Sequence, residues 1–360
     1  MSGTSMDGVD TALVQMSGDN IKLIAFDNYP MPLSIKDALL SVCHNQTTNI
    51  EAIGELDHRL GHLFADAVIN LLQKSKHSAS QITAIGCHGQ TVFHQPSPPH
   101  AFSLQLGDAN IIAAKTGIDT VADFRRKDMS LGGQGAPLVP AFHQHVFPIQ
   151  QSTTVVLNIG GIANISVLHP HKPVIGYDTG PGNVLMDAWC HLHRQEPFDR
   201  GGVFAQQGKL SQPLLNQLLE DHYFSMTPPK STGRELFNLD WLKNILIDYA
   251  LSAEDIQRTL CQFSATSIAN ELSQYCFGKT PQLLVCGGGA KNPLLMQDIK
   301  SLLPDWQVSM TEEKGINGDY MEAMAFAWLA YRNIHKLPSS LPEVTGASRA
   351  ASLGVYYPKD

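Results

Sequence analysis

In the first half of the chain, the spacing of apolar residues alternates between two periods. Short runs with β-branched and aromatic residues predict strands at residues 11–17 and 20–29. Steps of three and four then predict a long amphipathic helix through Ile50, Ile53, Leu56, Leu60, Leu63, Ala67 and Leu71. Strand patterns return at 82–89 (ITAIGCHG) and 117–124 (GIDTVADF). The glycine-rich stretch 131–140 (LGGQGAPLVP) is typical of a crossing between domains.

The second half repeats this alternation. Two β-branched runs around a central Gly-Gly predict a hairpin over 153–168 (TTVVLNIGGIANISVL). A helical pattern over 255–276 leads to a buried strand at 282–286, the glycines of 287–289, and a helix that begins near Asn292. A last helix is predicted at 319–335. The chain is therefore α/β throughout, and its 360 residues suggest about two domains.

Composition narrows the function. The chain is 43% hydrophobic and 16% charged, which is ordinary for a globular protein. Its formal net charge of −8 argues against a nucleic-acid scaffold, which usually needs a basic surface. Six scattered cysteines without a CxxC pair indicate neither a disulfide framework nor a zinc ribbon. No signal peptide or apolar span stands out, so we expect a cytoplasmic protein without membrane or nucleic-acid partners.

Three glycine-rich turns are each attached to an apolar strand. They lie at 3–8, 160–161 and 287–289. Backbone N–H groups can converge on phosphate at such turns, so two of them facing each other would hold a polyphosphate; turns without any ligand are the alternative. Neither GxxxxGK[ST] nor GxGxxG is present, which excludes the two commonest nucleotide fingerprints. The remaining well-known solution is the sugar kinase, Hsp70 and actin fold.

Eight segments, in order along nearly the whole chain, resemble the anhydro-N-acetylmuramic acid kinases of bacteria. They are MSGTSMDGVD, GCHGQTVFH, VADFRRKDMSLGGQGAPLVPAFH, LNIGGIAN, YDTGPGN, KSTGRE, VCGGGAKNPLLM and GDYMEAMAFAWLA. The resemblance implies a two-domain α/β fold of the sugar kinase/Hsp70/actin (ribonuclease H-like) type with a nucleotide cleft between its lobes. The expected lobes are residues 1–122 with 336–360, and residues 123–335. It also implies ATP and Mg²⁺, a homodimer, and a role in recycling peptidoglycan.

The same resemblance assigns the nucleotide-binding residues. The opening turn would line the ATP phosphates with Gly3, Thr4, Ser5, Met6, Asp7, Gly8, Val9 and Asp10, and Asp7 would position Mg²⁺. Gly160 and Gly161 would form the opposite turn. Gly287, Gly288, Gly289 and Asn292 would lie at the adenosine, although a sharp strand-to-helix connection without ligand is the alternative there.

In a 1,6-anhydro sugar, O6 is tied to C1, so its phosphorylation requires water to attack the anomeric carbon. A general base must activate that water, as in an inverting glycosidase. Asp178 matches the family's catalytic aspartate and is the expected base. Glu322 is the second family carboxylate, expected to help hold the water, and an exposed helix position is its alternative. The expected product is N-acetylmuramic acid 6-phosphate.

Substrate recognition calls for a cation, because the lactyl group of muramic acid carries a carboxylate. Arg125 and Arg126 are both candidates, and the sequence leaves open which one points inward. His88 and Gln90 are expected at sugar hydroxyls or the acetamido group. For each of these, a salt bridge or a satisfied buried polar group is the alternative.

Three alternatives remain: a zinc site, a chaperone and a kinase for an ordinary sugar. His143 with His145, or His191 with His193, would share one face of a strand as zinc ligands do, but neither pair has a third ligand at a recognisable spacing. A chaperone of the Hsp70 type would need a peptide-binding appendage that this chain has no residues to build. A kinase for an ordinary sugar would need a base for a hydroxyl rather than for water.

The opening of the chain departs from the family pattern. Relatives carry several apolar residues before MSGTSMDG that form a first strand, and this sequence starts inside the turn. We therefore expect weakened ATP binding or reduced stability for the chain as given. Unpaired backbone groups left next to such a strand would each cost about 1–3 kcal/mol.

Overall fold

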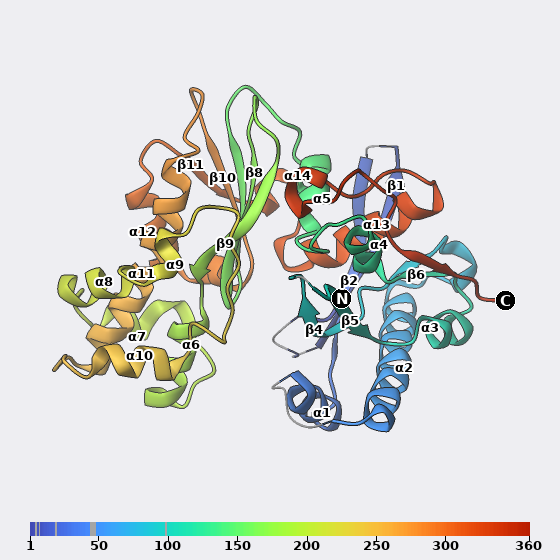
Figure 1. The fold of residues 1–360 in the computed structure, drawn as a ribbon, viewed down its shortest axis with the longest axis horizontal. Coiled ribbons are helices and arrows are strands. Elements are labelled where there is room, and N and C mark those ends of the chain that lie inside the picture. Colours follow the sequence, from blue (N-terminus) through green and yellow to red (C-terminus); the bar gives the residue numbers. More distant parts are fainter. Residues whose placement is uncertain (4–5, 7, 19, 44–47, 98) are drawn as a thin grey trace. The chain divides into compact units, whose positions relative to one another are not determined.

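The computed structural model of the protein describes residues 1–3, 6, 8–18, 20–43, 48–97 and 99–360. It divides into two compact units, which Figure 1 shows as ribbons. Unit 1 comprises Met1–Val146 with Tyr320–Asp360, and unit 2 comprises Phe147–Asp319. Both contain strands and helices, so the α/β class expected from the sequence is confirmed.

The elements of unit 1 begin with the hairpin of β1 and β2. They are β1 Gly8–Ser17, β2 Asn20–Pro30, α1 Leu33–Cys43, α2 Ile50–Ser75, η1 Ala79–Gln81, β3 Ile85–Gly86, β4 Gln90–Gln95, β5 Phe102–Leu106, α3 Ala109–Thr116, β6 Thr120–Ala122, α4 Phe124–Ser130, α5 Val139–Val146, α13 Met321–Ile334, α14 Pro342–Thr345 and β12 Val355–Tyr357. The short helix η5, Gly318–Tyr320, crosses the boundary between the units.

The elements of unit 2 surround one five-stranded sheet. They are β7 Thr154–Ile159, β8 Ile162–Leu168, β9 Ile175–Pro181, α6 Val184–Arg194, η2 Arg200–Gly202, α7 Val203–Gln206, α8 Gln212–Leu219, α9 His222–Ser225, α10 Leu239–Leu246, α11 Ala253–Ser273, β10 Gln282–Cys286, η3 Gly288–Lys291, α12 Pro293–Leu302, β11 Gln307–Met310 and η4 Thr311–Lys314.

The sheet of unit 2 places the glycine turn at one end of its central strands. Its order is β11-β10-β7-β8-β9, with β10 parallel to β7 and β11, and β8 antiparallel to both neighbours. Leu157, Ile165 and Leu283 on these strands are buried against the helices, as β-branched and leucine-rich central strands require. The hairpin predicted around Gly160 and Gly161 is confirmed.

Unit 1 holds three small sheets: β1-β2, β12-β6-β3 and β4-β5. Helix α2, the long amphipathic helix expected from the sequence, packs on β1 and β2 through one apolar face. Asn49 caps its start by accepting a hydrogen bond from the Ala52 N–H (2.8 Å), and Lys76 ends it in the left-handed conformation. Helix α13 packs against β1 and β3.

One sequence-based expectation about these elements is wrong and another is only partly right. The strand predicted at 82–89 is present but short: it pairs with β6 at Ile85–Gly86, because Gly86 packs against the backbone of α13 and Gly89 takes a positive φ of 75°. The glycine-rich stretch 131–140 is no crossing between domains. It folds over the buried Asp128, whose Oδ2 accepts a hydrogen bond from the Gly135 N–H (2.8 Å) within unit 1.

The compact units also end elsewhere than the expected lobes. Residues 123–146 and 320–335 belong to unit 1, rather than to a lobe of 123–335. One reason why α4 belongs to unit 1 is a hydrogen bond from the Thr345 hydroxyl to Asp128 Oδ1 (2.7 Å), which joins the C-terminal segment to α4. Helix α13 likewise packs on β1, β3 and α5. The expected nucleotide cleft between lobes stays a prediction.

Candidate active site

In unit 2, the glycines expected to bind nucleotide meet around Asn183. The Asn183 N–H donates to the Gly160 carbonyl (2.9 Å), and its side-chain amide donates to the Ile159 carbonyl (3.2 Å). Gly287 has a φ of 84°, which favours glycine. A Cβ on Gly289 would overlap Ile159, whereas a Cβ on Gly288 would meet nothing closer than Asn183 Nδ2 at 3.9 Å. A Cβ on Gly161 would likewise meet nothing closer than 3.8 Å, so Gly161 and Gly288 are the two of these glycines with an open backbone face.

Asn292, which the sequence assigns to adenosine, has a structural role here. Its Oδ1 accepts hydrogen bonds from the N–H groups of Leu294 (3.1 Å) and Leu295 (3.3 Å), and Pro293 stands at the first position of α12. This is an N-cap, which fixes the start of the helix directly after the glycines. The helix expected to begin near Asn292 is confirmed.

Asp178 lies in β9 of unit 2 and is half-buried. Its Oδ2 accepts hydrogen bonds from the Ser231 hydroxyl (2.9 Å) and the Thr232 N–H (3.0 Å). Neither bonds to Oδ1, so within the described residues that oxygen has no hydrogen-bond donor. Burial raises the pKa of Asp178 and the charge of Glu235 adds to the rise, while the two hydrogen bonds lower it. A carboxylate with one fixed and one available oxygen suits a general base.

In unit 1, the half-buried Arg125 contacts the buried His88, and the charge of the half-buried Glu322 acts on Arg125. Arg125 donates to His88 Nε2 through Nη2 (2.8 Å) and Nε (3.2 Å), and through Nη1 to the Gly135 carbonyl (2.8 Å). Burial lowers the pKa of Arg125 to about 10, and the charge of Glu322 opposes this. Burial likewise raises the pKa of Glu322, and Arg125 opposes that shift. The alternative of an exposed helix position for Glu322 is wrong.

The two candidate arginines point to different surroundings. Arg126 forms an ion pair with Asp123 (3.1 Å) and leaves 64% of its side chain exposed. Arg125 is the one that is directed inward. Gln90 is also buried, and its Oε1 finds no hydrogen-bond partner among the described residues. An unpaired buried acceptor is costly, so Gln90 is a reasonable contact for a sugar hydroxyl or amide.

The opening turn is described only in part, because Thr4, Ser5 and Asp7 lie outside the described residues. Gly3 has open space around it, and Met6 and Val9 are buried in the core of unit 1. Gly8 begins β1, where a Cβ would lie 2.8 Å from the side chain of Asn28. Asp10 accepts a hydrogen bond from that same Asn28 (2.8 Å).

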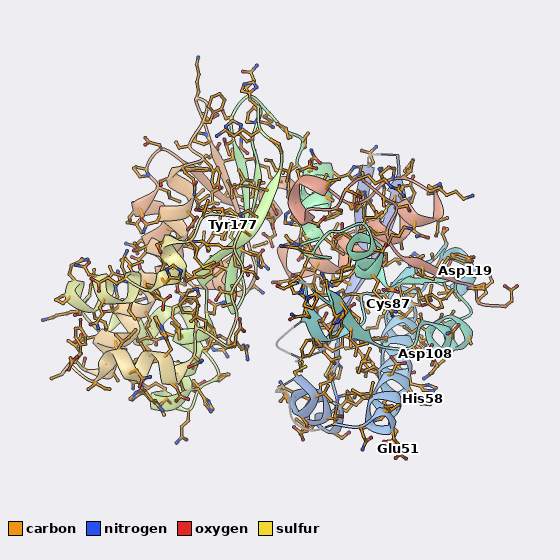
Figure 2. All side chains as sticks on the ribbon, viewed as in Figure 1. Glu51, His58, Cys87, Asp108, Asp119 and Tyr177 are labelled. Carbon is orange, nitrogen blue, oxygen red and sulfur yellow. The ribbon has the colours of Figure 1, made fainter. Side chains whose placement is uncertain are left out.

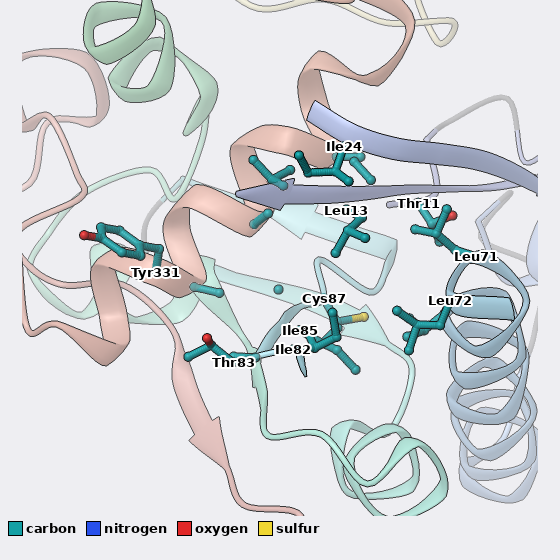
Figure 3. Close-up of a pocket in the computed structure, with 18 of the residues that line it drawn as sticks. Thr11, Leu13, Ile24, Leu71, Leu72, Ile82, Thr83, Ile85, Cys87 and Tyr331 are labelled. Atoms are coloured by element: carbon teal, nitrogen blue, oxygen red, sulfur yellow. The ribbon is translucent and has the colours of Figure 1, made fainter. Parts of the chain in front are cut away.

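Unit 1 also contains an apolar cavity of about 610 Å³. Figure 3 shows side chains of β1, α2 and the segment 82–87 around it, among them Leu13, Leu71, Leu72 and Ile85. Beside it, Met1 pairs with Asp10: the Met1 ammonium donates to the Asp10 carbonyl, and the Asp10 N–H donates to the Met1 carbonyl, both at 2.8 Å. This pair involves only the beginning of β1, the strand that lines one side of the cavity.

The histidine pairs lie on helices, not along one face of a strand as the zinc-site alternative would require. His143 and His145 belong to α5, and His191 and His193 belong to α6. Residues two apart on a helix point in different directions, so neither pair presents two nitrogens to one ion. Across the residues that are placed, no three His, Cys, Asp or Glu side chains gather in a way that could hold a metal. None of the six cysteines, all within the described residues, is in a disulfide.

Asp178 and Glu322 lie in different units, so their action on one water stays a prediction. The residues that hold Asp178, Ser231 and Thr232, were not singled out from the sequence, although the segment KSTGRE was recognised. Serine and threonine next to a glycine are common in loops, so this pattern alone does not indicate a functional site. None of the helices in the described ranges combines the length and apolar character needed to cross a membrane.

Among known structures, the likeness is weak. The (R)-2-hydroxyglutaryl-CoA dehydratase component A of Acidaminococcus fermentans aligns with 91% of this chain and 100% of its own, at 10% identity and a TM-score of 0.44. A putative N-acetylmannosamine kinase of Listeria monocytogenes aligns with 89% of this chain and 98% of its own, at 12% identity and a TM-score of 0.34. We draw no conclusion from TM-scores this low.

Sequence relatives are much closer. The family model described as anhydro-N-acetylmuramic acid kinase matches residues 1–359. The anhydro-N-acetylmuramic acid kinase of Vibrio parahaemolyticus is 66% identical, covering 100% of this chain and 97% of the relative. Those of Vibrio cholerae and Pasteurella multocida are 62% and 54% identical, covering 99% and 100% of this chain and 97% and 96% of the relatives. The resemblance seen in the motifs is thereby confirmed, and the chain belongs to the anhydro-N-acetylmuramic acid kinase family.

Proposed function

We propose that this kinase opens the 1,6-anhydro ring of anhydro-N-acetylmuramic acid and phosphorylates O6 in one reaction, with Asp178 as the general base. Membership of the family, an ATP-dependent phosphotransferase family acting on a sugar alcohol group, supports the reaction class. The main support for the role of Asp178 is that hydrogen bonds hold its carboxylate through Oδ2 and leave Oδ1 available.

The reaction balances without an acid residue at the leaving oxygen. Asp178 Oδ1 takes a proton from water as the water oxygen bonds to C1. The C1–O6 bond breaks, O6 bonds to the γ-phosphorus, and the bond from that phosphorus to the β,γ-bridging oxygen breaks to release ADP. The product is N-acetylmuramic acid 6-phosphate. Glu322 helps to hold the water, and Arg125 faces the lactyl carboxylate with its guanidinium.

The nucleotide is held by the glycine turns. In unit 2, the backbones of Gly161 and Gly288 are open to a ligand, while Gly160, Gly287 and Gly289 shape the turns beside them. In unit 1, the turn from Gly3 to Asp10 provides the phosphate contacts. Mg²⁺ in kinases binds mainly to phosphates, waters and one or two carboxylates, so the lack of a ligand cluster in the described ranges fits such a site. Its charge would stabilise the phosphate oxygens, with Asp7 as the protein ligand.

The enzyme works on a small sugar acid in the recycling of peptidoglycan. We place it in the cytoplasm as a homodimer, which sedimentation at several protein concentrations would test.

Product analysis tests the proposal against an ordinary sugar kinase. The protein is incubated with Mg·ATP and either the anhydro sugar or ordinary N-acetylmuramic acid, which lacks the 1,6-bridge and has a free O6 hydroxyl. We expect ADP and a 6-phosphate mainly from the anhydro sugar. Preferential phosphorylation of the open sugar would overturn the role of water and of its base. Asp178→Asn is expected to abolish the product while ATP binding persists.

A further inference from the structure

The proposed base is held by one segment of unit 2 through four hydrogen bonds. Two reach the carboxylate, from Ser231 and Thr232. The other two fix the backbone of Asp178: its N–H donates to the Lys230 carbonyl (3.0 Å), and its carbonyl accepts from the Tyr223 hydroxyl (2.6 Å). Tyr223, Lys230, Ser231 and Thr232 in the segment 223–232 therefore fix both the backbone and the carboxylate of Asp178.

A buried ion pair anchors this segment. Lys230 Nζ lies 2.7 Å from Glu271 Oε1 on α11, with the Lys230 side chain 1% exposed and that of Glu271 10% exposed. The ammonium also donates to the Tyr223 carbonyl (3.1 Å) and lies over the Tyr223 ring at 4.7 Å. An ammonium so completely desolvated has little freedom to move, because each alternative position leaves a charge unpaired.

Glu271 is held in turn by β9. The hydroxyl of Tyr177, labelled in Figure 2, donates to Glu271 Oε2 (2.9 Å) and lies 3.1 Å from the Tyr275 hydroxyl. Tyr177 directly precedes Asp178 in the chain. The network is therefore closed: it leaves β9 at Asp178, passes through residues 223–232 and α11, and returns to β9 one residue away.

We propose that Ser231 and Thr232 are positioning residues, which turn the Asp178 carboxylate so that Oδ1 alone meets the attacking water, and that the Lys230–Glu271 pair holds them in place. This inference rests on the proposed role of Asp178. Both donors favour the ionised carboxylate, which is the form a base requires. The Thr232 donor is a backbone N–H, so the side chain of Ser231 is the part that substitution can remove.

Other charged and titratable groups also face Asp178. Glu235 raises the pKa of Asp178, and the Asp178 charge raises that of Tyr223. Lys230 and Glu271 form an ion pair with each other, so their opposite charges offset one another. Because none of these groups is removed by changing Ser231, the effect of that substitution on the pH profile reports the lost hydrogen bond.

The test compares Ser231→Ala with the wild type. We expect kcat for the anhydro sugar to fall about tenfold or more, with the KM for ATP unchanged, because general-base contributions are of this size. The acidic limb of kcat against pH should move to higher pH, since the lost donor stabilised the ionised carboxylate. Ser231→Thr, which restores a hydroxyl, should recover most of the wild-type kcat and most of the wild-type pH dependence. Thermal unfolding verifies that each variant is folded.

Ser225→Ala is the matched control. Ser225 lies in the neighbouring α9, is exposed, and donates to the carbonyl of His222 in its own turn (2.8 Å). It should leave kcat and the pH profile as in the wild type. A folded Ser231→Ala enzyme with the wild-type profile would overturn the inference. If instead Asp178→Asn itself kept full activity, the proposed function would fail, and the two failures are thus distinguishable.

Should Ser231→Ala not fold, Tyr223→Phe provides a second test. It removes one hydroxyl that donates to the Asp178 carbonyl and keeps the ring over Lys230. We expect a lower kcat without a change in the KM for ATP. Wild-type kcat in this variant would overturn the claim that the segment positions the base through its backbone.

Discussion

At the scale of single residues, burial separates the two arginines of the DFRRKD segment. We predict that Arg125→Lys lowers kcat/KM for the anhydro sugar about tenfold or more, because an ammonium cannot reproduce the planar guanidinium contacts to His88, Gly135 and a carboxylate. Steady-state kinetics with varied sugar measures this. Arg126→Lys is the matched control and should stay within about twofold, since its exposed ion pair contributes little. Equal losses in both variants would contradict the assignment.

The sequence predicts residue types at this scale better than their surroundings. It indicates that a cation and two carboxylates are needed, but which arginine turns inward depends on α4, which leaves Arg125 half-buried and Arg126 exposed. Ser231 and Thr232 become visible only when the fold brings them to Asp178, 53 and 54 residues earlier in the chain. Contacts of that kind leave no periodic pattern.

At the scale of elements, the turn after β10 separates a glycine needed for folding from one available to a ligand. We predict that Gly289→Ala destabilises the protein by about 1–3 kcal/mol, because the new Cβ overlaps Ile159 in a packed core. Gly288→Ala should leave stability within about 0.5 kcal/mol of the wild type but weaken ATP binding. Thermal unfolding and calorimetric titration with ATP separate the two effects. Unchanged ATP affinity in Gly288→Ala would show that the nucleotide does not approach this backbone.

The apolar cavity of unit 1 gives a second prediction at this scale. A short apolar segment added before Met1 would run antiparallel to β1, because Met1 already pairs with Asp10 in that sense. It would bury its side chains in the cavity, so we expect a higher Tm and tighter ATP binding. A Gly/Ser segment of equal length is the control. An unchanged Tm and an unchanged ATP Kd in the apolar variant would contradict this prediction.

Elements with strong periodicity are the ones that the sequence predicts best. Helix α2, the hairpin of β7 and β8, and the start of α12 follow from apolar spacing, a Gly-Gly turn and a capping asparagine. The strand expected at 82–89 is confirmed only over Ile85–Gly86, because the packing of Gly86 on α13 and the positive φ of Gly89 limit its length.

At the scale of the whole molecule, we predict that stability falls below about pH 6.5, partly through His143. Burial lowers the pKa of His143 from 6.5 to about 3, so the folded protein keeps it neutral while the unfolded chain protonates it. The stabilisation is therefore present above pH 6.5 and is lost toward pH 3, by about 1.4 kcal/mol per pH unit.

Urea unfolding at about pH 7.5 and about pH 5.5 measures this effect. His143→Gln, which does not titrate, should show a smaller loss between the two pH values, by about 1 kcal/mol. An identical loss in wild type and variant would contradict the assignment to His143.

The division into units illustrates what the sequence leaves undetermined at this scale. A glycine-rich stretch suggests a linker by composition, but the buried Asp128 draws residues 131–140 and the C-terminal segment into unit 1. The number of units follows from length, whereas their boundaries depend on a single buried carboxylate and on the packing of α13.

The central claim is that one water enters the sugar for each phosphate transferred, with Asp178 as its base. The most direct measurement is the reaction with Mg·ATP and the anhydro sugar in ¹⁸O-water, quenched early and analysed by mass spectrometry. Unlabelled N-acetylmuramic acid 6-phosphate in the same water controls for exchange at C1. We predict one ¹⁸O at C1, none in the phosphate, and no product with Asp178→Asn. A 6-phosphate without ¹⁸O at C1, or labelled product from the Asp178→Asn enzyme at the wild-type rate, would contradict the account.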